Sequence, residues 1–172
     1  MARILDLLEG QTDRMRQGLE PNYELLIEIA EYFRSFPDLY HHPKEELIID
    51  YLLIRQAPGA AELQRLTLEH EEGSNELSRF CRTLIYLLME PERGRADFLE
   101  ASQVFLEQER RHVTWEDERF FEIAEAGLAK ADWTEIEVKI ARLRYAVFER
   151  EALSRFTLLG KALERSHKQP AT

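Results

Sequence analysis

Along most of this chain, apolar residues recur at every third or fourth position, and this helical period constrains the fold more than any other feature. Glycine and proline, which interrupt helices, number only 7 and 6 among 172 residues. No segment alternates between apolar and polar residues as a β-strand would. The sequence therefore predicts helices at residues 2–18, 21–55, 59–89, 95–131, 133–150 and 152–166, with the second disturbed at Pro37 and Pro43.

Four of the predicted helices are long and amphipathic, and short connections join them. Such helices run antiparallel to their neighbours and bury their apolar faces against one another. We therefore expect an all-α fold, an up-down four-helix bundle over residues 1–131. Residues 132–172 are expected to add one or two helices within the same domain. These helices either cover the end of the bundle or form a dimer surface, so a monomer and a homodimer both stay open.

Composition and charge argue against several classes of function. The net charge of −10 disfavours a nucleic-acid partner, since phosphate binding needs clustered cations. No apolar stretch approaches the roughly 20 residues of a membrane span, and the charged start MARILDLLEG lacks the features of a signal peptide. The single cysteine, Cys81, is in register with apolar neighbours and is expected to be buried, in keeping with a reducing compartment. We expect a cytoplasmic protein.

Ionisable residues interrupt the apolar faces of three predicted helices. They are His41 and Glu45 in the second helix, His70 in the third, and His112 and Glu116 in the fourth. Each His/Glu pair has a spacing of four residues, so both side chains project from one face of a helix. A single histidine on an apolar face is more often a hydrogen-bonded core residue than a metal ligand. The recurrence on three helices favours a shared role instead.

Counting residues from the predicted turns places His41, His70 and His112 at one height in an antiparallel bundle, to within about one turn. Unpaired ionisable groups at one level of a bundle interior are costly, and a bound cation removes that cost. Imidazole and carboxylate donors without a thiolate suit iron, manganese or zinc. The supply of donors exceeds what one tetrahedral zinc ion needs, so the pattern favours a pair of metal ions.

Three segments resemble the hemerythrin HHE cation-binding family, in particular its bacterial members. They are YHHPKEE at Tyr40 to Glu46, EHEEG at Glu69 to Gly73, and HVTWEDERFF at His112 to Phe121. The resemblance covers roughly residues 1–131. It implies a hemerythrin-type bundle in which the five histidines and glutamates named above hold an oxo- or carboxylate-bridged pair of iron ions.

The resemblance leaves more than one choice of ligand. Asp117 is a rival to Glu116, because animal hemerythrins place an aspartate at that spacing from the histidine. His42 and Glu46 form a second pair with a spacing of four, rotated by about 100° around the helix. We interpret this pair as exposed and supporting, unless Pro43 distorts the turn enough to exchange the two pairs. Glu69, beside His70, is a further candidate.

The sequence departs from the family at two points. Members usually carry a histidine in the first helix, whereas counting back from Gly18 puts the expected ligand before Met1. Either the start was assigned at an internal methionine, or the first helix is shortened and the site is incomplete. Leu66 stands where oxygen-carrying hemerythrins have another histidine. This favours a metal-binding or sensing protein over a reversible oxygen carrier.

The resemblance implies a non-haem iron protein that binds oxygen or nitric oxide and serves in sensing, iron handling or oxidative-stress response. Two further hypotheses stay open. One is a structural or interaction bundle that has lost its metal together with the first-helix ligand. The second is a carboxylate-bridged iron oxidase or peroxidase, for which the sequence shows no separate acid-base motif.

Overall fold

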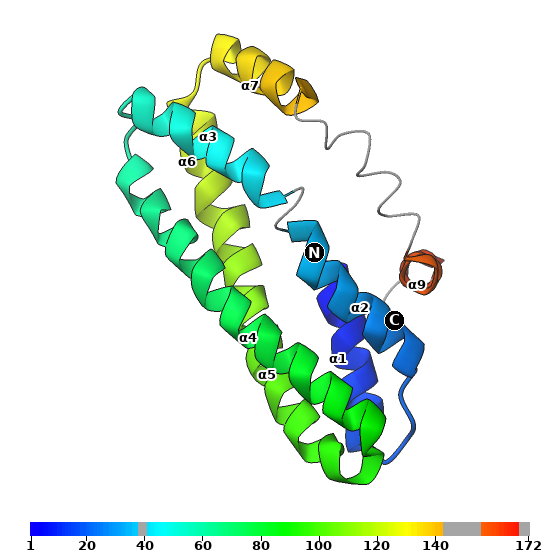
Figure 1. Ribbon diagram of the computed structural model, residues 1–172. Coiled ribbons are helices and arrows are strands. Elements are labelled where there is room, and N and C mark those ends of the chain that lie inside the picture. Colours follow the sequence, from blue (N-terminus) through cyan, green and yellow to red (C-terminus); the bar gives the residue numbers. More distant parts are fainter. Residues whose placement is uncertain (38–40, 143–155, 169–172) are drawn as a thin grey trace.

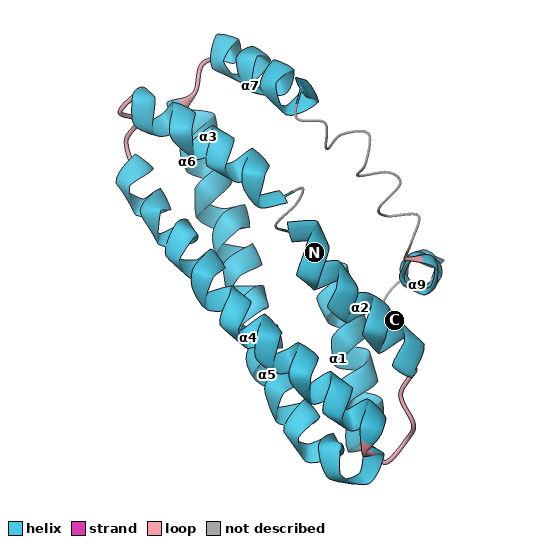
Figure 2. Cartoon of the chain, in the orientation of Figure 1, coloured by secondary structure: helices cyan, strands magenta, loops and turns pink. Residues whose placement is uncertain are grey.

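The structure, a computed structural model, describes residues 1–37, 41–142 and 156–168 (Figure 1). Every regular element within these ranges is helical, and no strand occurs among them (Figure 2). The elements are α1 (Ala2–Arg16), α2 (Tyr23–Phe36), α3 (His42–Ile54), the 3-10 turn η2 (Ala60–Leu63), α4 (Gln64–Met89), α5 (Pro91–Trp115), the π-helical turn η3 (Glu116–Phe120), α6 (Phe121–Gly127), α7 (Lys130–Arg142) and α9 (Thr157–Lys168). The prediction of an all-helical chain is confirmed.

Helices α4 and α5 form a long antiparallel hairpin along which the other elements are arranged (Figure 1). In one half of the molecule, α1 packs on α5, α2 packs on α4, and α1 and α2 contact each other, so four helices close a ring. In the other half, α3 packs on η2, α6 and α7, while α6 continues α5 through η3. Helix α9 lies against α1 and α2.

The predicted second helix is described as two α-helices on either side of residues 38–40, which lie outside the described part of the chain. Helix α2 ends at Phe36 and α3 begins at His42, with Pro37 at the end of the first and Pro43 in the opening turn of the second. A proline inside a helix removes a hydrogen bond and clashes with the preceding turn, whereas the first turn tolerates it. The predicted helices over 133–150 and 152–166 correspond to α7 and α9, but residues 143–155 lie outside the described part of the chain.

The buried apolar residues form two clusters rather than one. The first joins α1, α2 and α9 to the hairpin, and its centre is the stacked pair Phe80 and Phe105, with ring centroids 5.0 Å apart. The second joins α3, η2, α6 and α7. On α5 and η3, the buried residues between Leu106 of the first cluster and Phe120 of the second are His112 and Glu116. A polar layer therefore separates the two apolar cores.

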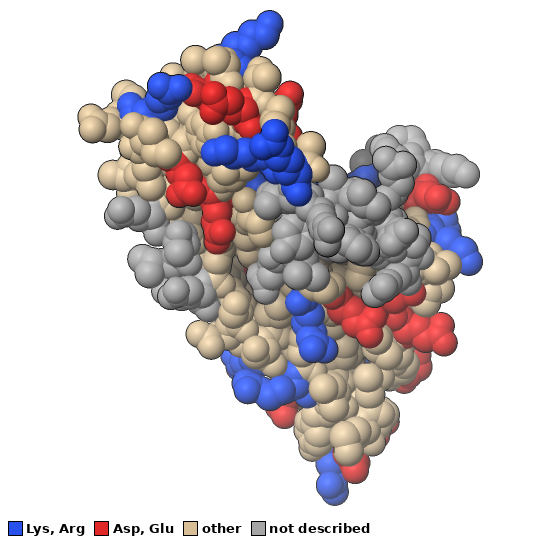
Figure 3. All heavy atoms as spheres, turned by 45° about the horizontal axis from the view of Figure 1, so that its top comes forward, with Lys and Arg blue, Asp and Glu red and all other residues tan. Residues whose placement is uncertain are grey.

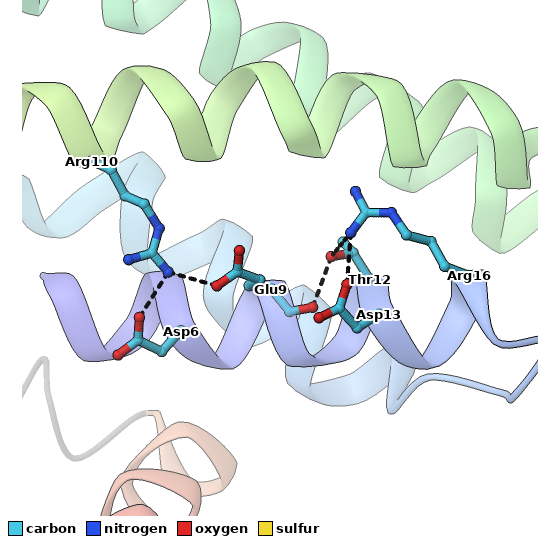
Figure 4. A network of polar contacts seen from close by, with 6 residues as sticks. All are labelled: Asp6, Glu9, Thr12, Asp13, Arg16 and Arg110. Carbon is cyan, nitrogen blue, oxygen red and sulfur yellow. Dashed lines mark hydrogen bonds and ion pairs between the residues drawn. The ribbon is translucent and has the colours of Figure 1, made fainter. Parts of the chain in front are cut away.

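Ion pairs tie the helices together at the surface. Arg110 on α5 reaches both Asp6 and Glu9 on α1, at 2.8 and 2.9 Å (Figure 4). At the opposite end, Arg55 after α3 donates to Asp132 of α7, which also accepts a hydrogen bond from the backbone of Ala129. Exposed pairs of the first kind contribute little each. Their effect is to fix the orientation of α1 on α5.

The surface carries charges of both signs. In the face shown in Figure 3, basic and acidic side chains are interspersed among uncharged residues. Over the described residues, no helix combines the length and the apolar character that crossing a bilayer requires.

The α4–α5 turn allows a direct test of the packing. A Cβ atom on Gly94 would lie 2.6 Å from the Cα atom of Leu87, which the backbone cannot accommodate without shifting. We expect Gly94→Ala to lower the free energy of unfolding by about 1–3 kcal/mol in urea denaturation. Gly10→Ala is the matched control, because nothing lies within 4 Å of its Cβ position on the exposed side of α1. It should raise stability by about 0.5–1 kcal/mol. Equal effects of the two substitutions would contradict this packing.

Candidate metal centre

Three helical segments deliver the ionisable residues to the polar layer. His41 lies immediately before α3, and Glu45 is in the first turn of that helix. His70 comes from the N-terminal part of α4. His112 is in the last turn of α5, and Glu116 opens η3. The structure thus brings all five predicted ligands together in the interior between α3, α4 and the α5–η3 segment.

The donor atoms fall into two groups of three. One consists of His42, His70 and His112, and we call it the three-histidine group. The second consists of His41, Glu45 and Glu116, and we call it the carboxylate group. Within each group, one donor atom from each residue lies within 4.8 Å of those of the remaining two. Each group is therefore narrow enough to surround one cation.

The two carboxylates lie between the groups. Glu45 has one oxygen 3.2 Å from Nε2 of His41 and its second oxygen 3.7 Å from Nε2 of His70. Glu116 places Oε1 at 2.7 Å from Nε2 of His112 and at 3.5 Å from Nε2 of His41. Each glutamate thus approaches a histidine of both groups. The two glutamates therefore lie where they could serve as donors to either group.

The polar layer is buried. Glu45 and Glu116 are each 4% exposed, and His112 is 8% exposed. Nε2 of His41, Nε2 of His70 and both carboxylate oxygens of Glu45 are buried without a hydrogen bond of acceptable geometry, although they approach one another closely. Buried polar atoms of this kind are costly, and charged ones more so. Convergent acceptor atoms fit a metal cation, which would satisfy all of them at once.

Burial acts on both glutamates, but their contacts with histidines separate their pKa values. Burial, and then the neighbouring charge of Glu116, raise the pKa of Glu45 to about 9. Burial alone would also raise the pKa of Glu116, but its contacts with His112 and His41 outweigh burial and hold it below the usual range. For His70, burial, followed by the charge of His112, lowers the pKa to about 4. Without a cation, the raised pKa keeps a proton on Glu45, whereas Glu116 stays ionised beside His112 and His41.

The backbone is irregular at Glu116. The helix changes there from α to π over Glu116–Phe120 before α6 resumes. Single π turns inside long helices occur frequently at functional sites. Glu116 is buried in the layer, whereas the next residue, Asp117, is exposed. The described side chains thus place Glu116, and not its predicted rival, in the carboxylate group.

His42, Glu46 and Glu69, the further candidate ligands, differ in their surroundings. His42, interpreted as exposed, is only partly exposed, and its ring stacks on that of His70 with centroids 3.7 Å apart. Its predicted partner Glu46 is exposed and belongs to neither group. The side chain of Glu69 lies outside the described residues. His42 therefore joins the centre without Glu46, and the two predicted pairs are not exchanged.

A cavity of about 780 Å³ adjoins the three-histidine group. His42, His70 and His112 line one side of it. Glu109 and Gly73 also line it, and a Cβ on Gly73 would lie 3.7 Å from a carboxylate oxygen of Glu109. Burial raises the pKa of Glu109 to about 7. The sequence reasoning missed Glu109, although it precedes His112 by one helical turn and so shares its face.

Comparisons with known proteins give no relative. No protein-family model, no curated protein and no solved structure matches this chain. The interpretation of the centre therefore depends on its residues and their geometry.

The raised pKa of Glu45 makes the stability of the metal-free protein depend on pH. Between about pH 7.5 and 9, the folded chain keeps the Glu45 proton, whereas the unfolded chain, with an ordinary carboxyl pKa, has lost it. The folded state binds more protons, so the free energy of unfolding falls as pH rises, by at most about 1.4 kcal/mol per pH unit. Urea unfolding across this window measures the slope. Glu45→Gln should flatten it, and an unchanged slope would show that Glu45 does not hold the proton.

Proposed function

We propose that this chain is a hemerythrin-like four-helix bundle that binds a pair of iron ions. The observation that carries the proposal is the pair of three-donor groups with two buried glutamates between them. The ring of α1, α2, α4 and α5, with α3 and α6 extending two of its helices, fits the bundle that the sequence motifs imply. Manganese and zinc are compatible with the same imidazole and carboxylate donors.

The sequence left open whether the site is complete without a histidine from the first helix, and the donors of the two groups bear on this question. The two groups draw their residues from α3 with His41 before it, from α4, and from α5 with η3. The two groups supply six protein donors without a histidine from α1, and the two glutamates among them would offset two of the four positive charges of a ferrous pair. The proposal therefore treats the described centre as sufficient for binding. If the unmodified chain binds metal, the alternative hypothesis of a bundle that has lost its metal is rejected.

The chain is proposed to act as a non-haem iron protein of the cytoplasm that takes oxygen or nitric oxide in sensing, iron handling or oxidative-stress response. Bound ferrous ions supply an open coordination position for a diatomic ligand. The protein side chains hold the ions, exclude water through the two apolar clusters, and provide the opening at the three-histidine group. The cavity beside that group gives a small molecule a route to the centre.

Anaerobic reconstitution with ferrous iron tests the proposal. We expect about two iron ions per chain by elemental analysis and a higher melting temperature, because a ligand that binds only the folded state stabilises it. His112→Ala removes a donor of the three-histidine group and the neighbour of Glu116, so iron affinity should fall by at least about tenfold.

Two control variants distinguish the loss of a metal ligand from a general loss of iron binding. His167→Ala removes a histidine near the end of α9, outside both groups, and should retain iron. Asp117→Asn removes the exposed rival carboxylate and should also retain iron, whereas Glu116→Gln should not. Absence of tight iron binding by the unmodified chain would reject the proposal in favour of a structural bundle.

A second candidate function, a peroxidase-like enzyme, is favoured by the size of the cavity. Its 780 Å³ falls in the range of sites for organic molecules and is far more than a diatomic ligand needs. Glu109 supplies the acid-base group that the sequence did not reveal, since a pKa near 7 suits proton transfer at neutral pH. Such an enzyme would reduce hydrogen peroxide to two water molecules while a hydroquinone-type reductant is oxidised to the quinone.

Peroxide consumption by the iron-loaded protein tests this candidate. Thr114→Trp places a large side chain at the cavity wall and removes no donor of either group. It should retain iron but lower reductant-dependent peroxide consumption by about tenfold or more, because the reductant is excluded. Equal consumption by the variant and the unmodified protein would remove the case for a substrate site in the cavity.

A further inference from the structure

The two donor groups are chemically unequal. The three-histidine group offers only imidazole nitrogen atoms, from His42, His70 and His112. The carboxylate group offers one imidazole and two carboxylates. Imidazole suits zinc and ferrous iron, whereas carboxylate oxygen suits harder ions such as manganese. The two positions are therefore expected to rank metal ions differently.

Burial adds a second difference between the groups. All three members of the three-histidine group line the cavity, whereas none of His41, Glu45 and Glu116 is among its described lining residues. Three protein donors with one position facing a cavity are the pattern of a catalytic zinc site, in which the fourth position takes water or substrate. The carboxylate group instead has both of its glutamates enclosed in the protein, with side chains 5% exposed.

The charge of the donors is a third difference between the two groups. Imidazole binds a metal in its neutral form, so the three-histidine group brings no negative charge to its ion. A divalent ion among three imidazoles keeps its charge and is a strong Lewis acid at the cavity. The second ion needs the two carboxylates to offset its charge in a buried position. One position therefore favours reactivity toward a small molecule, and its neighbour favours charge neutralisation.

We propose that the centre is heterodinuclear, with a zinc or ferrous ion in the three-histidine group and a manganese ion in the carboxylate group. This inference rests on the proposed function, because it requires that the chain bind a metal pair. Zinc exceeds manganese in affinity at most sites of nitrogen and oxygen donors. Selection at the carboxylate group thus depends on zinc being limiting, so that it fills the three imidazoles first.

The experiment gives the metal-free full chain one equivalent of zinc and then excess manganese, and determines the metals on each chain by native mass spectrometry. The expected main species carries one zinc and one manganese ion. Chains with two zinc ions beside chains with two manganese ions would overturn the heterodinuclear assignment, although elemental analysis would give the same average. Zinc alone on every chain would also overturn it. In both cases the chain still binds metal, whereas binding of neither zinc, manganese nor iron would reject the proposed function itself.

Two substitutions assign each ion to its group. Glu45→Gln keeps the size of the side chain and removes a donor of the carboxylate group that also lies 3.7 Å from His70, so manganese affinity should fall more than about tenfold and zinc affinity by a clearly smaller factor. His42→Ala should do the reverse, because His42 belongs only to the three-histidine group. Circular dichroism confirms that each variant remains helical, and His167→Ala is the control for the loss of a histidine. Equal loss of both metals in both variants would contradict separate positions.

Discussion

The buried carboxylates Glu45 and Glu116 are the constraint on which the rest of this structure depends. Each is 4% exposed, and each lies in a polar layer between two apolar clusters. Two negative charges at this depth need compensation, since removing a charge from water costs several kcal/mol. The neighbouring histidines compensate only in part, because burial lowers the pKa of His70 to about 4. The charge of Glu45 is therefore offset in one of two ways, by a proton or by a bound cation.

A proton on Glu45 and a cation bound to Glu45 exclude each other. A carboxylate that holds a proton cannot also offer both oxygens to a metal, so binding of a cation displaces the proton. Burial and Glu116 raise the pKa of Glu45 to about 9, which means that the displaced proton costs free energy at neutral pH. Metal affinity must exceed that cost. Metal binding by this centre is therefore expected to strengthen as pH rises toward the pKa of Glu45.

The helical content was predictable from the sequence because it depends on local period. The apolar residues that recur along 59–89 lie within η2 and α4, which run from Ala60 to Met89. The helix predicted over 21–55, with a disturbance at Pro37 and Pro43, is described as α2 up to Phe36 and α3 from His42, so the two prolines lie where the disturbance was predicted. The π turn at Glu116 was not predictable from any pattern of residues, since the residues of η3 continue the same helical period. Tertiary packing determines such irregular turns, and a single sequence does not contain it.

The candidate metal centre was likewise predictable where the helices are regular and not predictable where the backbone is irregular. The depth argument found His41, Glu45, His70, His112 and Glu116, because antiparallel helices of regular rise bring equal heights together. It misplaced His42, because neighbours on a continuous helix point about 100° apart. His41 instead lies before the first residue of α3, so both histidines reach the interior.

The polar layer also relates metal binding to folding. Its donors come from three segments that are distant in the sequence, and the α4–α5 hairpin spans both apolar clusters and the layer between them. Each cluster can be stabilised by its own burial, but the layer contributes no apolar contact to hold them together. Bound ions would cross-link α3, α4 and α5 at that level, and their binding free energy would add to the stability of the fold.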